Sequence, residues 1–274
     1  MLISTICSPV LPFFIAVLGI STAPSEPLLD QGYNAMYDLR FDAAHKIFAN
    51  YESARPGDPL GPVSDAAAYL FSEFDRLRIL QSDLFINDKN YLSERKREPD
   101  PRTKAQFEQD LDKARRLAAS EMQKPDAQAN AMFAETLASG LQADYLALIE
   151  RRDFAALSQI KKAREFAEKL LSSHPDYYDA YLAIGVENYL LSRKSAPIRW
   201  LLQASGAETN KQEGVAKLRL TAEHGHYLMP YARLLLAVAA LRDGDKNTAR
   251  NLLSWLAQRY PHNNLYQEEL EKLR

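Results

Sequence analysis

Residues 233–261 read RLLLAVAALRDGDKNTARNLLSWLAQRYP, and this pattern predicts two short amphipathic helices joined by a tight turn. The turn falls at Asp243-Gly244-Asp245, because glycine adopts backbone conformations that other residues avoid. Ala237 and Ala249 stand where the two helices would touch. Pro261 lacks a backbone N–H and cannot continue the second helix. The stretch therefore indicates a helical hairpin.

The same spacing recurs elsewhere in the chain, which is the signature of a repeat architecture. An alanine is followed twelve positions later by a proline in three places: Ala44 and Pro56, Ala163 and Pro175, Ala249 and Pro261. The residues four positions after these alanines are Phe48, Ala167 and Leu253. Those twelve positions before them are Gly32, Arg151 and Ala237. Helices approach closely only where side chains are small, so the recurrence predicts hairpins that stack on one another.

These positions resemble the tetratricopeptide repeat (TPR) family. In that family a small residue on the first helix faces an alanine on the second, a bulky apolar residue follows one turn later, and a proline ends the unit. The best copies are Gly32, Ala44, Phe48 and Pro56, and then Ala237, Gly244, Ala249, Leu253 and Pro261. The middle copy fits only on its second helix, because Arg151 stands at the small position. Tyr181, Ile184 and Gly185 resemble the start of a fourth copy, in which Pro197 takes the place of the alanine.

The remainder of the chain also favours helices. No run alternates between apolar and polar residues, so strands are not expected. Ser64, Thr103 and Thr209 are the expected caps of three further helices. The resemblance implies an all-α fold, a right-handed superhelical stack of antiparallel helical hairpins (a TPR-like α-solenoid), with about five hairpins and a C-terminal capping helix. The alternative is a plain all-α bundle.

Composition limits the classes of partner. The chain has 274 residues, and its 34 basic and 36 acidic side chains give a net charge of −2. A nucleic-acid-binding protein usually carries a basic excess or stripe, so nucleic acid is not an expected partner. The one cysteine is Cys7. If the N-terminal segment is removed, the mature chain has no thiol for a disulfide, a metal or a nucleophile.

The N-terminal segment indicates export. Residues 1–25 carry no charged side chain, residues 10–20 are apolar, and Ser21-Thr22-Ala23 supplies small residues for cleavage. We expect residues 1–23 to be a signal peptide, or alternatively an anchor that associates with the membrane through residues 2–23. Residues 24–274 are expected to form a single TPR-like domain, with residues 192–208 as an insertion between repeats. The expected location is the periplasm or cell envelope of a bacterial-type cell.

Motifs that would indicate catalysis or a cofactor are weak. His174 and His262 flank Pro175 and Pro261, and a histidine near a helix C-terminus is favoured by the helix dipole. Glu223-x-x-His226 has the spacing of half a di-iron site, but no second such pair occurs. No Gly-x-Ser-x-Gly elbow and no phosphate-binding loop occurs either. We therefore expect neither a cofactor nor a metal.

The aromatic residues around position 180 are the strongest candidates for binding. We assign a partner-binding role to Tyr178, Tyr181, Asn188, Tyr189 and Trp200. Tyrosine and tryptophan are frequent anchors in protein interfaces. The alternative interpretation is that this group packs in the core, between a helix and the insertion.

The sequence thus predicts a non-catalytic scaffold that binds a segment of another protein on a concave helical surface. A helical enzyme or small-ligand-binding protein is the alternative. Its pocket would lie near His224 and His226, under the insertion at residues 192–208. A third interpretation makes the chain a fixed subunit of an envelope assembly.

Overall fold

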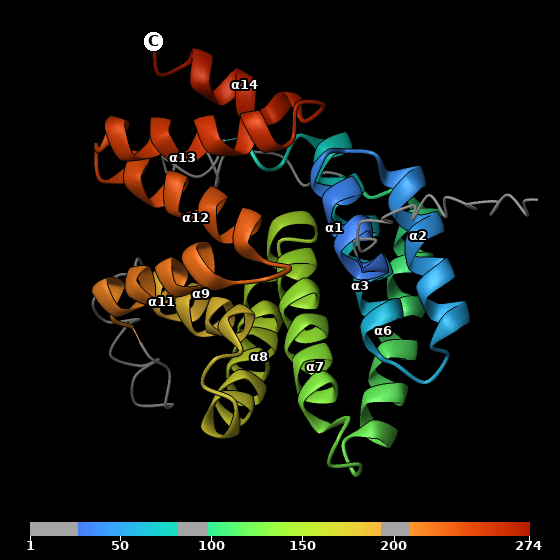
Figure 1. Ribbon diagram of the computed structural model, residues 1–274. Helices are drawn as coiled ribbons and strands as arrows, with labels where there is room; N and C mark the ends of the chain where they lie inside the picture. The colour runs from blue at the N-terminus through green and yellow to red at the C-terminus, as the bar shows by residue number, and fades with distance from the viewer. Residues whose placement is uncertain (1–26, 82–97, 193–208) are drawn as a thin grey trace, which may run out of the picture.

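The computed structural model describes residues 27–81, 98–192 and 209–274, and all regular structure in these ranges is helical (Figure 1). The predicted all-α fold is confirmed for this part of the chain, and it is compatible with an α-solenoid. The expected signal peptide or anchor at residues 1–23 lies outside the described residues, as do Pro197, Trp200 and all of the expected insertion except Ser192. None of the described helices is both long enough and apolar enough to cross a bilayer.

The helices follow one another with short connections wherever the chain is described. Their order is α1 (Leu28–Tyr37), α2 (Phe41–Ala54), α3 (Leu60–Leu77), α6 (Pro101–Glu121), α7 (Gln128–Asp144), the π-helix η1 (Tyr145–Ile149), α8 (Asp153–Ser173), the 3₁₀-helix η2 (Tyr178–Ala180), α9 (Tyr181–Ser192), α11 (Lys211–His224), α12 (Met229–Arg242), α13 (Lys246–Arg259) and α14 (Asn264–Glu271). Consecutive helices pack as pairs: α1 with α2, α3 with α6, α7 with α8, α9 with α11, and α12 with α13. α14 packs on α13.

Three of these pairs share one turn geometry. A residue with positive φ precedes the N-cap of the second helix in each: Leu39 at 57°, Arg151 at 57° and Gly244 at 78°. The second helices also end alike, with C-cap φ and ψ of −139° and 67° at Arg55, −133° and 71° at His174, and −129° and 73° at Tyr260. Pro56, Pro175 and Pro261 come directly after these C-caps. Matching turns and matching ends give the three pairs a common local geometry.

The middle pair is aligned differently from the sequence expectation. Arg151 belongs to the turn, at the position of Gly244, and is not the small residue of the first helix. α8 has 21 residues, whereas α2 and α13 have 14 each. The seven extra residues add about two helical turns and therefore keep the same face inward. Ala156 and Ala163 are accordingly both 3% exposed and both face the core.

Small residues lie where paired helices come closest. A Cβ added to Gly32 in α1 would lie 2.2 Å from Cε1 of Phe48 in α2. In the α9–α11 pair, a Cβ on Gly185 would lie 2.9 Å from Leu218 and 3.0 Å from the carbonyl oxygen of Gly214. Gly214 comes four residues after the N-cap Asn210, as Ala44 does after Arg40. Gly214 thus stands at the alanine position of the fourth copy, which the sequence pattern had assigned to Pro197.

The alanine and bulky apolar positions of the repeats are also in the core, whereas Gly244 and the terminating prolines are exposed. Ala44, Phe48, Ala167 and Ala249 are fully buried, and Ala237 and Leu253 are 1% exposed. Asn263 caps α14, and its side chain accepts a hydrogen bond from the N–H of Leu265 at 3.2 Å.

Three predicted helix starts were wrong by a few residues. α3 begins at Leu60, and the Ser64 hydroxyl donates to the Tyr33 hydroxyl at 3.0 Å in the interior. Asp100 caps α6 in place of Thr103, and Asn210 caps α11 in place of Thr209. The Oδ1 atoms of Asp100 and Asn210 accept hydrogen bonds from the N–H groups two and three residues further on, which have no partner within the helix.

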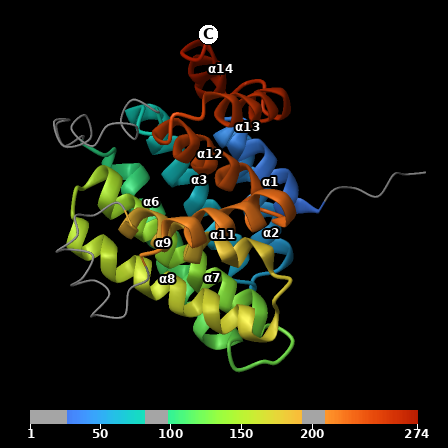
Figure 2. The same ribbon diagram turned by 90° about the vertical axis from the view of Figure 1, so that its left-hand side faces the viewer.

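The first helix also contacts the last ones, which an open stack of repeats would not require. Figures 1 and 2 both place α1 beside the end of α13. The ring of Tyr37 lies 5.7 Å from that of Tyr260, and the Asn263 side chain donates to the carbonyl of Tyr37 at 2.9 Å. Asp38 accepts hydrogen bonds from the N–H of His262 at 3.0 Å and from its Nδ1 at 2.7 Å. The first described helix, α1, is therefore joined to the corner between α13 and α14.

The contact between Gly32 and Phe48 gives a direct test of helix approach. Gly32→Ala should destabilise the protein by about 1–3 kcal/mol, because the new methyl group overlaps the Phe48 ring. Gly140→Ala in α7 is the matched control, since nothing lies within 4 Å of its added Cβ. That variant should gain roughly 0.5–1 kcal/mol from helix propensity. Urea unfolding measures both, and an equal response of the two glycines would contradict the assignment.

Asp38 provides a test of the junction between the chain ends. Burial favours its neutral form, but the hydrogen bonds from His262 and Arg40 outweigh burial and lower the pKa of Asp38. The carboxylate therefore stabilises the fold above the ordinary pKa of an aspartate, and this contribution is lost as the pH falls through the lowered value. Asp38→Ala should cost about 2–4 kcal/mol at neutral pH.

Hydrogen exchange should locate the effect of that substitution. Amide protection should fall in α13, α14 and α1, since these are the elements that Asp38 joins. Asp112→Ala, at an exposed site on α6, serves as the control and should leave protection unchanged. Uniform loss of protection along the whole chain in Asp38→Ala would count against a local junction.

Candidate functional site

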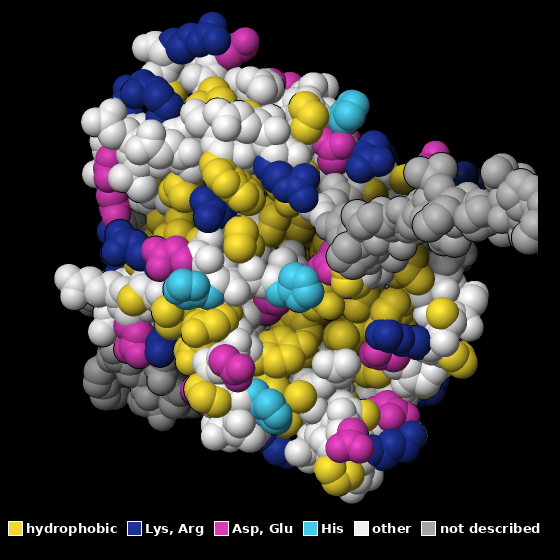
Figure 3. All heavy atoms as spheres, viewed as in Figure 1, with side chains coloured by type: hydrophobic (Ala, Val, Ile, Leu, Met, Phe, Trp, Pro, Cys, Tyr) yellow, Lys and Arg dark blue, Asp and Glu magenta, His cyan; other side chains and the backbone are white. Residues whose placement is uncertain are grey.

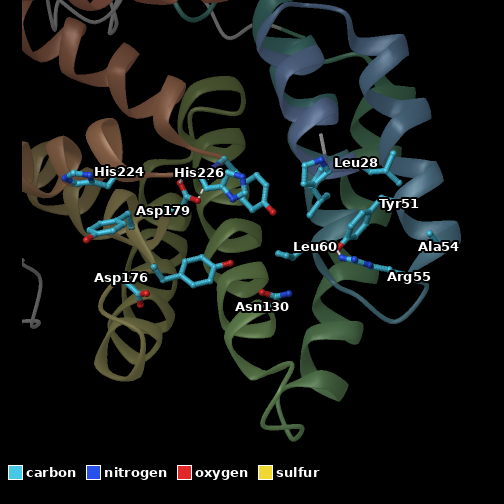
Figure 4. A pocket seen from close by; sticks show the side chains of 15 residues that line it. Leu28, Tyr51, Ala54, Arg55, Leu60, Asn130, Asp176, Asp179, His224 and His226 are labelled. Atoms are coloured by element: carbon cyan, nitrogen blue, oxygen red, sulfur yellow. Dashed lines mark hydrogen bonds between the residues drawn. The ribbon is translucent and has the colours of Figure 1, made fainter. Parts of the chain in front are cut away.

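A cleft of about 490 Å³ opens on the face of the molecule seen in Figure 3. It lies between α1, α2 and α3 on one side and η2 with the α11–α12 connection on the other, and α7 contributes Asn130 (Figure 4). The lining residues are Pro27, Leu28, Leu29, Tyr51, Ala54, Arg55, Leu60, Asn130, Asp176, Tyr177, Tyr178, Asp179, His224, His226 and Tyr227.

Most of the cleft is built from the starts of helices. Leu28 and Leu60 are the first residues of α1 and α3, and Asn130 lies in the first turn of α7. Asp176 to Asp179 lead into α9, and His226 and Tyr227 lead into α12. The N-terminal ends of five helices therefore gather around one hollow. Backbone N–H groups and the positive ends of helix dipoles favour electronegative groups at such a place.

The buried carboxylate of Asp179 fixes one wall of the cleft. It accepts hydrogen bonds from the backbone N–H groups of His226 at 2.9 Å, Tyr227 at 3.0 Å and Leu228 at 3.0 Å. Burial raises the pKa of Asp179, and the three N–H donors oppose that rise. Because three successive N–H groups share one carboxyl group, the connection before α12 is held in a single conformation.

Aromatic rings stack behind this wall. The Tyr227 ring lies 4.9 Å from that of Tyr33 in α1, and His226 stacks on Tyr227 at 4.2 Å. Nε2 of His226 is 2.5 Å from the carboxylate of Asp30, so the wall is tied to α1 as well. Tyr177 packs at 4.8 Å from the Phe133 ring. These contacts give the cleft a rigid aromatic lining.

The opposite wall carries a cation. The Arg55 guanidinium lies 5.2 Å from the centre of the Tyr51 ring, and its Nη1 donates to the Tyr51 hydroxyl at 3.2 Å. That hydroxyl donates to Asp58 at 2.6 Å. Arg55 itself is exposed, so its charge is available at the edge of the cleft (Figure 4).

The chemistry of the lining suits binding. Aromatic faces, the Asn130 amide, two histidines and one arginine offer stacking, hydrogen bonds and charge. No serine, threonine or cysteine is among the described residues of the lining. The described part of the chain also contains no group of three or more His, Cys, Asp or Glu side chains placed to hold a metal.

The structure brings only one of the five predicted binding residues to this cleft. Tyr178 lines it, with its ring 4.9 Å from that of His224. The Tyr181 hydroxyl donates to the carbonyl of Pro175 at 3.1 Å. Asn188 is fully buried and accepts a hydrogen bond from the N–H of Asn210 at 3.0 Å, which joins α9 to the start of α11. Tyr189 is 6% exposed and faces an interior cavity, and Trp200 lies outside the described residues.

Several cleft residues had no distinct signal in the sequence. Tyr51 belongs to the predicted apolar face of its helix, and Arg55 precedes a helix-ending proline like any surface residue. Tyr227 and Asp179 meet across 48 positions, which only the tertiary fold determines. No local signal in the sequence marked Asp179, His226 and Tyr227 as parts of one site.

A second polar group lies in the interior. Asp144 ends α7 and lines two small apolar cavities of about 70 and 110 Å³. Tyr231 of α12 donates a hydrogen bond to its Oδ2 at 3.1 Å. Burial raises the pKa of Asp144 to about 7, against a smaller opposing effect of that hydrogen bond. The carboxyl group of Asp144 therefore has a pKa far above the usual aspartate value.

Sequence comparisons do not assign the chain to a family. A scan against protein-family models finds no match for the chain, and a search of curated proteins finds no relative.

The raised pKa of Asp144 predicts a dependence of stability on pH. The folded protein keeps this proton up to about pH 7, whereas the unfolded chain releases it near 3.8. More protons are bound in the folded state between these values, so stability falls as the pH rises across that window. Asp144→Asn cannot ionise and still offers an oxygen to Tyr231. Its stability relative to the wild type should rise by about 4 kcal/mol between pH 4 and pH 8.

Unfolding by urea at several pH values measures this difference. Asp126→Asn, at an exposed position, should follow the wild type throughout. If Asp144→Asn also follows the wild type, the carboxyl group is not protonated in the folded protein.

Proposed function

We propose that this chain is an exported, TPR-like scaffold that binds an extended segment of a partner protein in the cleft between α1–α3 and the α11–α12 connection. The proposal is carried by one observation: the cleft is open to the surface and is lined by aromatic, hydrogen-bonding and cationic groups. Tyrosine and arginine are enriched among the residues that dominate protein interfaces. No cofactor takes part in such binding.

The resemblance to TPR proteins supports the architecture of this proposal. The shared turns before α2, α8 and α13 and the shared proline after each support a repeated hairpin, and a right-handed superhelix is the arrangement that the family implies. In such a stack the first helices of the hairpins face a common groove. The cleft is lined mainly at the starts of the first helices of the five pairs (α1, α3, α7, α9 and α12), and the ends of the second helices α2 and α11 complete it.

Location is the second part of the proposal. The uncharged, apolar character of residues 1–23 supports export to the periplasm or cell envelope. The partner is then another protein of that compartment, and nucleic acid is not an expected partner because the charge is nearly balanced.

A small-ligand-binding protein or an enzyme is the competing function, and the volume of the cleft is compatible with it. About 490 Å³ falls within the range of small-molecule pockets. Two histidines line the cleft, as that alternative requires. An open cleft without a serine, threonine or cysteine among its described lining residues accords better with a bound peptide segment.

Filling the cleft tests the proposal. Ala54 is exposed and lines the cleft, so Ala54→Trp should place an indole in the space of the partner segment. Ser53→Trp, one residue earlier on α2, is exposed but does not line the cleft and is the matched control. Peptides selected from a random library on the purified full chain should bind the control as they bind the wild type. They should lose roughly tenfold or more in affinity for Ala54→Trp.

Two results would contradict the proposal. One is that the library yields no peptide whose binding depends on the cleft. The other is that Ala54→Trp and Ser53→Trp bind every selected peptide equally well. Circular dichroism of both variants verifies that they remain helical.

A further inference from the structure

A second groove of about 310 Å³ lies beside the cleft, between α11, α12 and α13. Glu223 lines this groove and the next residue, His224, lines the cleft, so the two hollows are separated only by the end of α11. In Figure 3, hydrophobic side chains lie close to Lys and Arg side chains over α12, on the same face as the cleft. A segment that crosses the cleft can therefore continue into this groove.

Arg233 is the distinctive residue of the groove. Its guanidinium lies over the Trp255 ring, 4.1 Å from the ring centre. The side chain is half-buried, and its Nε is buried without a hydrogen-bond partner. Burial lowers the pKa of Arg233, and the charge of Glu223 only partly offsets this. A desolvated cation with an unused donor is costly unless an acceptor is supplied.

The acids around Arg233 do not supply that acceptor. Among the residues that the structure describes, no carboxylate lies within ion-pair distance of its guanidinium. Asp243 pairs with Lys211, and Asp245 caps α13 by accepting from the N–H of Thr248 at 3.0 Å. Glu223 is exposed, and its charge acts on Arg233 from beyond ion-pair distance. Asp243 and Asp245 are thus engaged elsewhere, and among the described residues Arg233 has no carboxylate at ion-pair distance.

We propose that Arg233, held against Trp255, binds the side-chain carboxylate of an aspartate or glutamate in the partner segment, with Arg219 at the edge of the same groove. The inference rests on the proposed function, because it assigns the chemistry of the segment that the cleft holds. The planar guanidinium presents donors in a fixed fork that matches a carboxylate. Stacking on Trp255 orients that fork before the partner arrives, so little rotamer freedom is lost on binding.

The geometry also explains why arginine stands at this position. A lysine ammonium would keep the charge but would lose the two-point contact with a carboxylate and the flat contact with the indole. Thr248 and Leu252 complete the lining, so the acid would lie beside both a hydroxyl group and an apolar surface.

The test uses a peptide selected on the full chain whose binding Ala54→Trp abolishes. Each aspartate or glutamate of the peptide is changed in turn to asparagine or glutamine, and affinity is measured by fluorescence anisotropy. One such change should weaken binding to the wild type roughly tenfold, as expected for a charge-assisted hydrogen bond. The same change should have no effect on Arg233→Gln and an intermediate effect on Arg233→Lys. Arg116→Gln, which removes an equal charge at an exposed site on α6, should behave as the wild type.

The remaining outcomes separate this inference from the proposed function. An amidated peptide C-terminus that abolishes binding would assign Arg233 to a terminal carboxylate and overturn the inference. Peptides that bind in the cleft with equal affinity for wild type and Arg233→Gln would overturn the inference and leave the proposed function intact. The absence of any cleft-dependent peptide would overturn both. Circular dichroism of Arg233→Lys and Arg233→Gln controls for unfolding.

Discussion

Close approach of paired helices is the constraint on which the rest of this structure depends. Gly32 lets α1 lie directly on the Phe48 ring, and the facing glycines Gly185 and Gly214 do the same for α9 and α11. A side chain at either place would push the helices apart and alter the angle between successive pairs. The cleft is formed by the starts of the first helices of each pair, so its width follows from these contacts at some distance from it.

Tight packing and polar anchoring have different roles around the cleft. Small residues determine the distance between paired helices, whereas Asp179 fixes the path of the connection between α11 and α12. A carboxylate that satisfies three backbone donors positions Tyr227 and His226 without using a regular helix or strand. Buried polar groups of this kind are costly unless fully hydrogen-bonded, and in exchange they specify one conformation. Asp144 differs, because it has an apolar surrounding and a single described hydrogen bond, and burial raises its pKa to about 7.

Features that depend on neighbouring residues could be predicted from the sequence. Features that depend on contacts between distant residues could not. Helices and their terminating prolines could be read from spacing. The pattern placed Gly32 opposite Ala44, whereas the atoms nearest to an added Cβ on Gly32 belong to the Phe48 ring. The longer α8 misled the alignment at Arg151, because two added turns preserve the helix face while shifting the register. Asn188 and Tyr189 carry polar groups at positions that a pattern cannot distinguish from a surface, yet they lie inside. The cleft itself unites residues from Leu28 to Tyr227, and no local pattern encodes such a meeting.

The contact between α1 and the α13–α14 corner has a consequence for how this molecule could evolve. An open array of hairpins gains or loses units at little cost, because each unit touches only its neighbours. Here α1 and the α13–α14 corner contact each other through Asp38, His262 and Tyr37. Insertion or deletion of one hairpin would move these partners apart. The contact between α1 and the α13–α14 corner therefore fixes the number of hairpins. Unfolding should likewise be a single cooperative event, unlike the fraying from free ends that linear arrays undergo.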